Sequence, residues 1–189
     1  MANANNSIIT GKLNGSIGKQ LVFRDWQGKT IVAKSPKSRR GGPSAAQVET
    51  QVKFLVASRY AKAILENPDQ SLAAAYAAML KPRQTVYSRA MQDFMSAPKV
   101  VLMDTLDYHG VVGNKIVARA FDDFRVTGVR VEVYAASGTL LEAGNAVQGT
   151  NGIDWTYTAT QANNLLAGSK IKAIATDVPG NQGTMEALI

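Results

Sequence analysis

The sequence predicts a mixed α+β fold in two parts: a β-hairpin with a three-helix unit, then a C-terminal all-β sandwich. Three observations support this prediction. Short runs of β-branched and aromatic residues lie before residue 36, apolar residues recur at helical spacing over residues 44–97, and short alternating runs separated by turn residues fill residues 99–189. We therefore expect two domains, residues 1–98 and residues 99–189.

The first part opens with three strand-like runs over residues 7–35: SIITGKL, KQLVFRDW and KTIVAKS. The segment DWQG between the last two is typical of a hairpin connection, with Gly28 at a positive φ. So few strands are not stable alone in water. We expect them to pack on the helices that follow, on the C-terminal domain, or on another copy of the chain.

A basic joint, residues 34–44 (KSPKSRRGGPS), precedes the helices. Ser44 suits a helix N-cap, and the apolar spacing that follows predicts a helix with one buried side, formed by Val48, Val52, Leu55, Val56, Ala63 and Ile64. QSLAAAYAAMLK and RQTVYSRAMQDFMSA predict a second and a third helix, closed by Pro82 and Pro98. The short connections predict antiparallel neighbours.

The second part alternates apolar and polar residues in RVEVYA, IDWTYTAT and KIKAIATD, so each of these strands should have one buried face. Turn signals separate the runs, at Ser137-Gly138, Asn151-Gly152 and Pro179-Gly180-Asn181. About seven short strands in this length are typical of a β-sandwich.

The runs VTGVRVEVYAASGTLLEAGNAV, IDWTYTAT and LLAGSKIKAIATDVPGNQG resemble the bacterial immunoglobulin-like domains of surface proteins, adhesins and phage virion proteins. This resemblance covers roughly residues 99–189 and implies an immunoglobulin-like β-sandwich, with Trp155 at the start of an inner strand. The first half, from GKLNGSIGKQ through the basic joint to AAQVETQVKF, is similar to a group of uncharacterised small bacterial proteins with a GK-hairpin. That likeness implies a recurring module without an assigned activity.

The composition argues against an enzyme. The chain has no cysteine and one histidine, His109, which excludes disulfides, thiolate metal sites and a pair of catalytic histidines in one chain. Acidic residues near predicted strand ends lack the D-x-D-x-D spacing of calcium loops, so we expect no metal, no cofactor and no catalytic residue; they are Asp104, Asp107, Asp122, Asp123 and Asp177.

Charge points to the basic joint as the candidate partner-binding site. Residues 1–99 contain 15 Lys and Arg against 5 Asp and Glu, whereas residues 100–189 contain 6 against 9. The candidate residues are the cations around the joint and the nearest aromatic residues: Lys34, Lys37, Arg39, Arg40, Phe23 and Trp26. They could bind an acidic protein face or phosphates. A solvated linker without a binding role is the alternative interpretation.

These observations favour a non-enzymatic structural or interaction protein. We expect a self-assembling or particle-associated subunit, of a virion-like, contractile or filamentous structure, that displays the immunoglobulin-like domain and binds copies of itself or other subunits. A nucleic-acid-associated protein that uses the basic joint is the alternative, and an adhesin-like glycan binder is a weaker one. No signal peptide or membrane span is predicted, so synthesis in the bacterial cytoplasm is expected, and a phage-like or extracellular particle is the expected destination under the assembly hypothesis.

Overall fold

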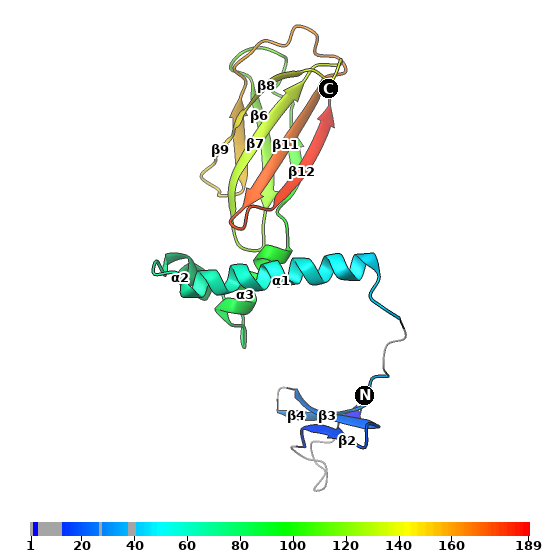
Figure 1. Cartoon of the computed structure of the whole chain (residues 1–189). Coiled ribbons are helices and arrows are strands. Elements are labelled where there is room, and N and C mark those ends of the chain that lie inside the picture. Colours follow the sequence, from blue (N-terminus) through cyan, green and yellow to red (C-terminus); the bar gives the residue numbers. More distant parts are fainter. Residues whose placement is uncertain (1, 4–12, 27, 38–40) are drawn as a thin grey trace. The chain divides into compact units, whose positions relative to one another are not determined.

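The computed structural model describes residues 2–3, 13–26, 28–37 and 41–189. The chain divides into two compact units, which we call unit 1 (Met1–Ala45) and unit 2 (Ala46–Ile189) (Figure 1). This division lies at the start of the first helix. The predicted boundary at residues 98/99 falls inside unit 2, where helices give way to strands, and as a domain boundary it stays a prediction.

Unit 1 is a small antiparallel sheet with the strand order β1-β4-β3-β2. The predicted hairpin is confirmed, because β3 and β4 pair along their whole length and Gly28 has a φ of 78°. The predicted run over residues 7–13 lies outside the described residues except for Leu13. The strands are β1 (Ala2–Asn3), β2 (Gly15–Ile17), β3 (Leu21–Trp26) and β4 (Lys29–Lys34).

The described residues of unit 1 form very little core. Among its described side chains, Phe23 and Thr30 are the buried ones, at 5% and 3% exposure. Ile17 and Leu21 remain exposed. A sheet of this size normally needs a covering layer to be stable in water.

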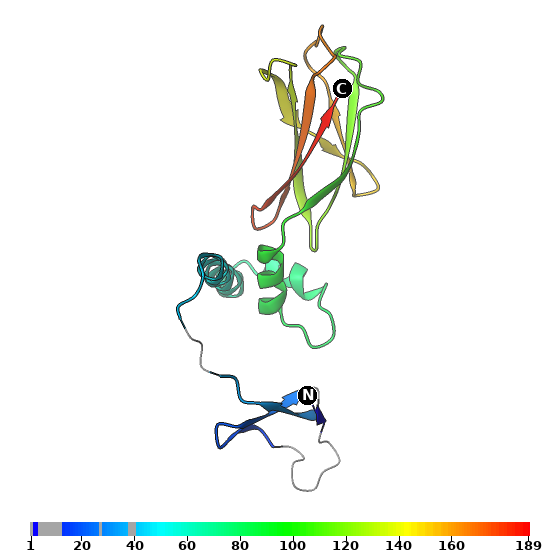
Figure 2. The ribbon, with the colours of Figure 1, turned by 90° about the vertical axis from the view of Figure 1, so that its right-hand side faces the viewer.

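Three helices open unit 2: α1 (Ala45–Glu66), α2 (Ser71–Ala77) and α3 (Val86–Met95). The predicted start of α1 after Ser44 is confirmed, and α3 begins at a capping box in which Thr85 and Ser88 exchange hydrogen bonds. The predicted antiparallel arrangement concerns the helices joined by short connections, α1 with α2 and α2 with α3, and it stays a prediction. In Figures 1 and 2, α3 runs across α1. The small side chains of Ala57, Ala61 and Ala90 allow the close contact that such a crossing requires.

The predicted buried stripe on α1 is wrong except at Ile64. Ile64 is buried, but Val48, Val52, Leu55 and Val56 are between 44% and 54% exposed, and Ala63 is exposed as well. The residues that α1 buries against the other helices are Ala57, Ala61 and Ile64. The periodicity therefore grouped residues from two sides of α1, and the side that packs on the other helices is the one with Ala57, Ala61 and Ile64.

Two four-stranded antiparallel sheets complete unit 2, which confirms a mixed α+β fold with an all-β C-terminal part (Figure 1). The first has the order β5-β6-β10-β9 and consists of β5 (Lys99–Asp104), β6 (Lys115–Phe121), β10 (Asp154–Thr158) and β9 (Val147–Gln148). The second has the order β12-β11-β7-β8 and consists of β12 (Gln182–Leu188), β11 (Lys170–Asp177), β7 (Val126–Tyr134) and β8 (Leu140–Asn145).

The two sheets share one core, made by every second residue of their central strands. β11 alternates strictly, with Ile171, Ala173 and Ala175 fully buried, as its sequence pattern predicts. Aromatic side chains of β10 fill the space between the sheets, and Tyr157 donates a hydrogen bond to the buried carboxylate of Glu142 (2.8 Å). Within the described part of the chain, no helix is long and apolar enough to span a membrane.

Candidate partner-binding surface

Unit 1 carries the entire net charge of the protein. It contains 8 Lys and Arg against one Asp, a balance of +7, whereas unit 2 contains 13 of each sign. The acid, Asp25, accepts a hydrogen bond from the backbone of Gly28 at the hairpin turn (3.0 Å). Among the described residues, the ion pairs all lie in unit 2. The positive charge of unit 1 is therefore not neutralised by ion pairs between its described residues.

Two predicted site residues, Lys34 and Lys37, line a hollow of about 590 Å³ at the opposite end of the hairpin from Asp25. We call it the lysine hollow; it is lined by Lys19, Gln20, Leu21, Lys34, Ser35, Pro36 and Lys37. The Ser35 backbone N–H donates to the Gln20 carbonyl (2.7 Å), so the start of the basic joint is fixed against the β2–β3 turn.

Lys19 was not predicted from the sequence as a site residue. It lies in a tight turn in which the Gln20 N–H bonds to the Ile17 carbonyl (3.1 Å), and both Gly18 and Lys19 have positive φ, 60° and 55°. Two such residues form the turn that best matches the twist of a hairpin. A side chain at positive φ costs roughly 1 kcal/mol. The sequence signal was Gly18-Lys19 between two strand-like runs, but a lysine at the second position is atypical of this turn.

The other predicted site residues have different outcomes. Arg39 and Arg40 lie outside the described residues. Phe23 is buried in unit 1, and Trp26 pairs with Lys29 through its backbone, while its side chain lies outside the described part. For these four residues, partner binding stays a prediction.

The lysine side chains of the hollow are suited to bind anions. Lysine residues from β4, the joint and the β2–β3 turn line one concave surface. Carboxylates or phosphates placed there would receive charge-assisted hydrogen bonds from several lysines. The lining residues of the hollow include no carboxylate, imidazole or thiol.

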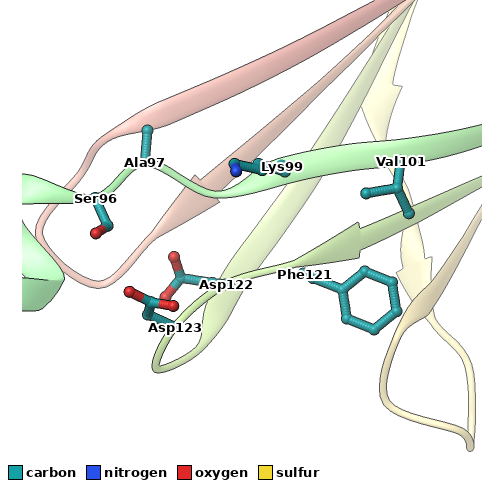
Figure 3. Close-up of a pocket in the computed structure, with 7 residues that line it drawn as sticks. All are labelled: Ser96, Ala97, Lys99, Val101, Phe121, Asp122 and Asp123. Carbon is teal, nitrogen blue, oxygen red and sulfur yellow. The ribbon is translucent and has the colours of Figure 1, made fainter.

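A second hollow, of about 240 Å³, lies in unit 2 where α3 leads into β5 (Figure 3). It is lined by Ser96, Ala97, Lys99, Val101, Phe121, Asp122 and Asp123. Figure 3 shows the Asp122 and Asp123 carboxylates side by side at the end of β6. Among the described residues, no group of three or more His, Cys, Asp or Glu is placed to hold a metal ion.

Beside this hollow, a buried polar network joins the helices to the sheets. Tyr76 donates to Asp93 (2.6 Å), and Asn181 donates both to Asp177 (2.7 Å) and to the Ser96 carbonyl at the end of α3 (3.1 Å). Burial raises the pKa of Asp93 to about 6, and the nearby Asp122 adds to this effect. Oδ1 of Asp93 and Oδ1 of Asp122 are buried without a hydrogen-bond partner in the structure. This network stabilises the junction within unit 2.

No protein-family model and no curated protein matches the chain. Among solved structures, one similar region occurs in a crystal structure of an engineered protein, with 22% sequence identity and a TM-score of 0.30. The similar region covers 40% of this chain and 15% of that protein.

Proposed function

We propose that this protein is a non-enzymatic interaction protein, a subunit of a self-assembling or virion-like, contractile or filamentous particle. In this proposal unit 1 binds an acidic face of a neighbouring subunit. The two sheets of unit 2 form an immunoglobulin-like sandwich that is displayed. The observation that carries the proposal is the composition of unit 1: Phe23 is the one buried apolar side chain among its described residues, and its charge balance is +7.

Stability is the first reason. Among the described side chains of unit 1, Phe23 is the one buried apolar residue, while Val22, Ile31 and Val32 are partly buried. A small sheet with so little described burial is expected to be weakly stable alone. Binding to another surface would supply the missing burial and pairing.

Charge is the second reason, and it identifies the partner surface. The lysine hollow favours carboxylates, and residues 100–189 have a balance of −3. Basic and acidic surfaces on different parts of one chain favour a head-to-tail contact, which generates rings or filaments. Such a contact should weaken as salt screens it.

The test compares the full-length wild-type chain with a Lys34→Ala/Lys37→Ala variant by analytical ultracentrifugation across protein and salt concentrations. We expect the wild type to form salt-sensitive assemblies that the variant loses. The matched control is Lys170→Ala/Lys172→Ala, which removes the same charge from β11, where both lysines pair with Glu186. Identical mass distributions for all three chains would refute a role of unit 1 in assembly.

A nucleic-acid-associated protein is the second candidate, and the three lysines of the hollow favour it. The same variants separate the two functions when fluorescence anisotropy is measured with duplex DNA and single-stranded RNA. Loss of two phosphate contacts would lower the slope of log affinity against log salt by about 1.4–1.8. Under the assembly proposal, wild type and variant bind nucleic acid equally weakly.

A further inference from the structure

Two carboxylates meet where α3 joins the sheets of unit 2. Asp93 lies in the last turn of α3 and is fully buried. Asp122 follows β6 and lines the hollow drawn in Figure 3. The Asp122 side chain lies within hydrogen-bonding reach of Asp93, and its charge disfavours an ionised Asp93. The pair therefore connects the helical part of unit 2 to its β part.

Each carboxylate has one oxygen with a donor and one without. Oδ2 of Asp93 accepts from the Tyr76 hydroxyl (2.6 Å). Oδ2 of Asp122 accepts from the backbone N–H groups of Phe124 and Arg125 (both 2.9 Å). Oδ1 of Asp93 and Oδ1 of Asp122 are buried without a hydrogen-bond partner in the structure. Two ionised oxygens in this position carry a desolvation penalty, and their like charges repel each other.

Among residues 41–189, all of which the structure describes, no cation forms an ion pair with Asp93. The titratable groups that face Asp93 are acids and phenols: Asp122, Asp177, Tyr60 and Tyr76. Arg89, one turn earlier on α3, donates to the Asp123 carbonyl instead. Burial raises the pKa of both tyrosines, so they stay neutral. Uptake of a proton from solvent is thus the way for this pair to lower its charge.

We infer that Asp93 and Asp122 share one proton, and that this proton stabilises the contact of α3 with the sheets. Protonated Asp93 donates through Oδ1 to Oδ1 of Asp122, while its Oδ2 still accepts from Tyr76. One proton pairs both unpartnered oxygens and removes one of the two charges. The other hydrogen bonds across this junction, such as those from Asn181 to the end of α3, involve no titrating donor.

The contact therefore depends on pH. The pKa of Asp93 is raised to about 6, first by burial and then by the neighbouring acids, so the docked state holds the proton at mildly acidic pH. An undocked Asp93 in water returns toward the ordinary value of 3.8. Docking of α3 is strongest below about pH 4 and weakens as the pH rises through about 6, by about tenfold between pH 5 and pH 8. The inference concerns unit 2 alone and goes beyond the proposed function.

The first experiment follows the aspartate carboxyl carbons of the full-length chain by NMR across a pH series. The Asp93 signal should titrate near pH 6 in the wild type and at a lower pH in Asp122→Asn, whose amide can donate to an ionised Asp93. Asp123→Asn is the matched control, because it removes an exposed carboxylate one residue away that accepts from Gln92. It should leave the midpoint of Asp93 close to the wild-type value. An unchanged midpoint in Asp122→Asn would overturn the shared proton.

The second experiment tests the contact of α3 by hydrogen exchange at pH 5 and pH 8, corrected for the intrinsic pH dependence of exchange. Protection of α3 amides in the wild type should fall by about tenfold at the higher pH, while β11 keeps its protection. Asp93→Asn should keep α3 protected at both pH values, since its amide donates to Asp122 without titrating. An equal loss in α3 and β11 would show that the proton stabilises unit 2 as a whole and would refute a specific effect on α3. Protection that returns at pH 8 on addition of Mg²⁺ or Ca²⁺ would identify a cation, and not a proton, as the bridge.

Discussion

Unit 1 and unit 2 differ in how many apolar side chains they bury and in their net charge. Unit 2 buries two apolar clusters, one among its helices and one between its sheets, and its charges sum to zero. Unit 1 buries Phe23 and Thr30 among its described side chains and holds the whole net charge. The comparison shows that one chain can combine a part with two apolar clusters and a part that buries few of its described side chains.

The stability of each unit can be measured separately, because each unit contains one of the two tryptophans of the chain. Trp26 belongs to unit 1 and Trp155 to the core of unit 2. A Trp26→Phe chain reports on unit 2 by fluorescence, and a Trp155→Phe chain reports on unit 1. The predictions below use these two reporters.

The largest effect should come from the sheet core of unit 2. Ile171 is fully buried, so Ile171→Ala should lower the free energy of unfolding of unit 2 by roughly 2–5 kcal/mol. Urea unfolding followed by Trp155 emission measures this loss. Phe23→Ala is the counterpart in unit 1 and should leave that transition unchanged. An equal loss in both variants would show that the two units unfold together.

A second effect concerns Asp93, whose pKa is raised from 3.8 to about 6 by burial. Because the folded state binds this proton more tightly than the unfolded state, the stabilisation is complete below about pH 4 and is lost as the pH rises through about 6. Asp93→Asn should remove this dependence and raise the stability of unit 2 above pH 6, by up to about 3 kcal/mol. Its amide can still accept from Tyr76 and can donate to the unpaired oxygen of Asp122.

Urea unfolding at a series of pH values checks the Asp93 prediction. Asp154→Asn is the control of opposite sign, since hydrogen bonds from Arg119 and Asn151 lower the pKa of Asp154 to about 2. Loss of the Asp154 carboxylate should destabilise unit 2 at neutral pH. The difference in free energy of unfolding between this variant and the wild type should vanish as the pH falls to about 2. A destabilised Asp93→Asn chain at high pH would contradict our account of the junction.

A third, smaller effect is expected at the start of α3. Thr85 caps this helix by accepting from the Ser88 N–H (3.2 Å), so Thr85→Ala should cost about 1 kcal/mol in unit 2. Thermal unfolding of the Trp26→Phe chain is a suitable measurement. Thr50→Ala, inside α1, is the control: alanine favours a helix interior, so stability should hold or rise. A loss at Thr50 as large as at Thr85 would contradict a capping role.

The smallest effect is predicted in unit 1. Lys19→Gly or Lys19→Asn should relieve the positive φ of the β2–β3 turn and stabilise the hairpin by up to about 1 kcal/mol. Lys19→Ala removes the same charge but keeps a side chain at positive φ, so it separates the effect of the charge from the effect of the backbone conformation. Trp26 emission in the Trp155→Phe chain reports the change. All three variants should also weaken the salt-sensitive assembly, because each removes a cation from the lysine hollow.

Local patterns in the sequence predicted much of unit 2. The alternation in KIKAIATD determines which side chains of β11 are buried, and Ser44 before AAQVETQVKF marks the start of α1. Such signals depend on neighbours in the sequence, which is why they can be recognised without a structure.

Contacts between distant residues could not be predicted in this way. Asp93 lies in a helix among apolar residues, and its burial depends on Asp122 and the β11–β12 turn, far along the chain. The first half of α1 shows the same limit, since periodicity predicts a buried face with Val48 and Val52, whereas both side chains are exposed. Lys19 was missed because its role comes from a backbone conformation that lysine rarely adopts.

The hydrogen bonds from Asn181 to the end of α3 have a consequence for how the protein is made. The carbonyls of Phe94 and Ser96 receive their bonds from a residue more than 80 positions later, close to the end of the chain. During synthesis, the helices therefore emerge long before this partner exists. We expect α3 to gain its full protection from hydrogen exchange only after residue 181 has left the ribosome.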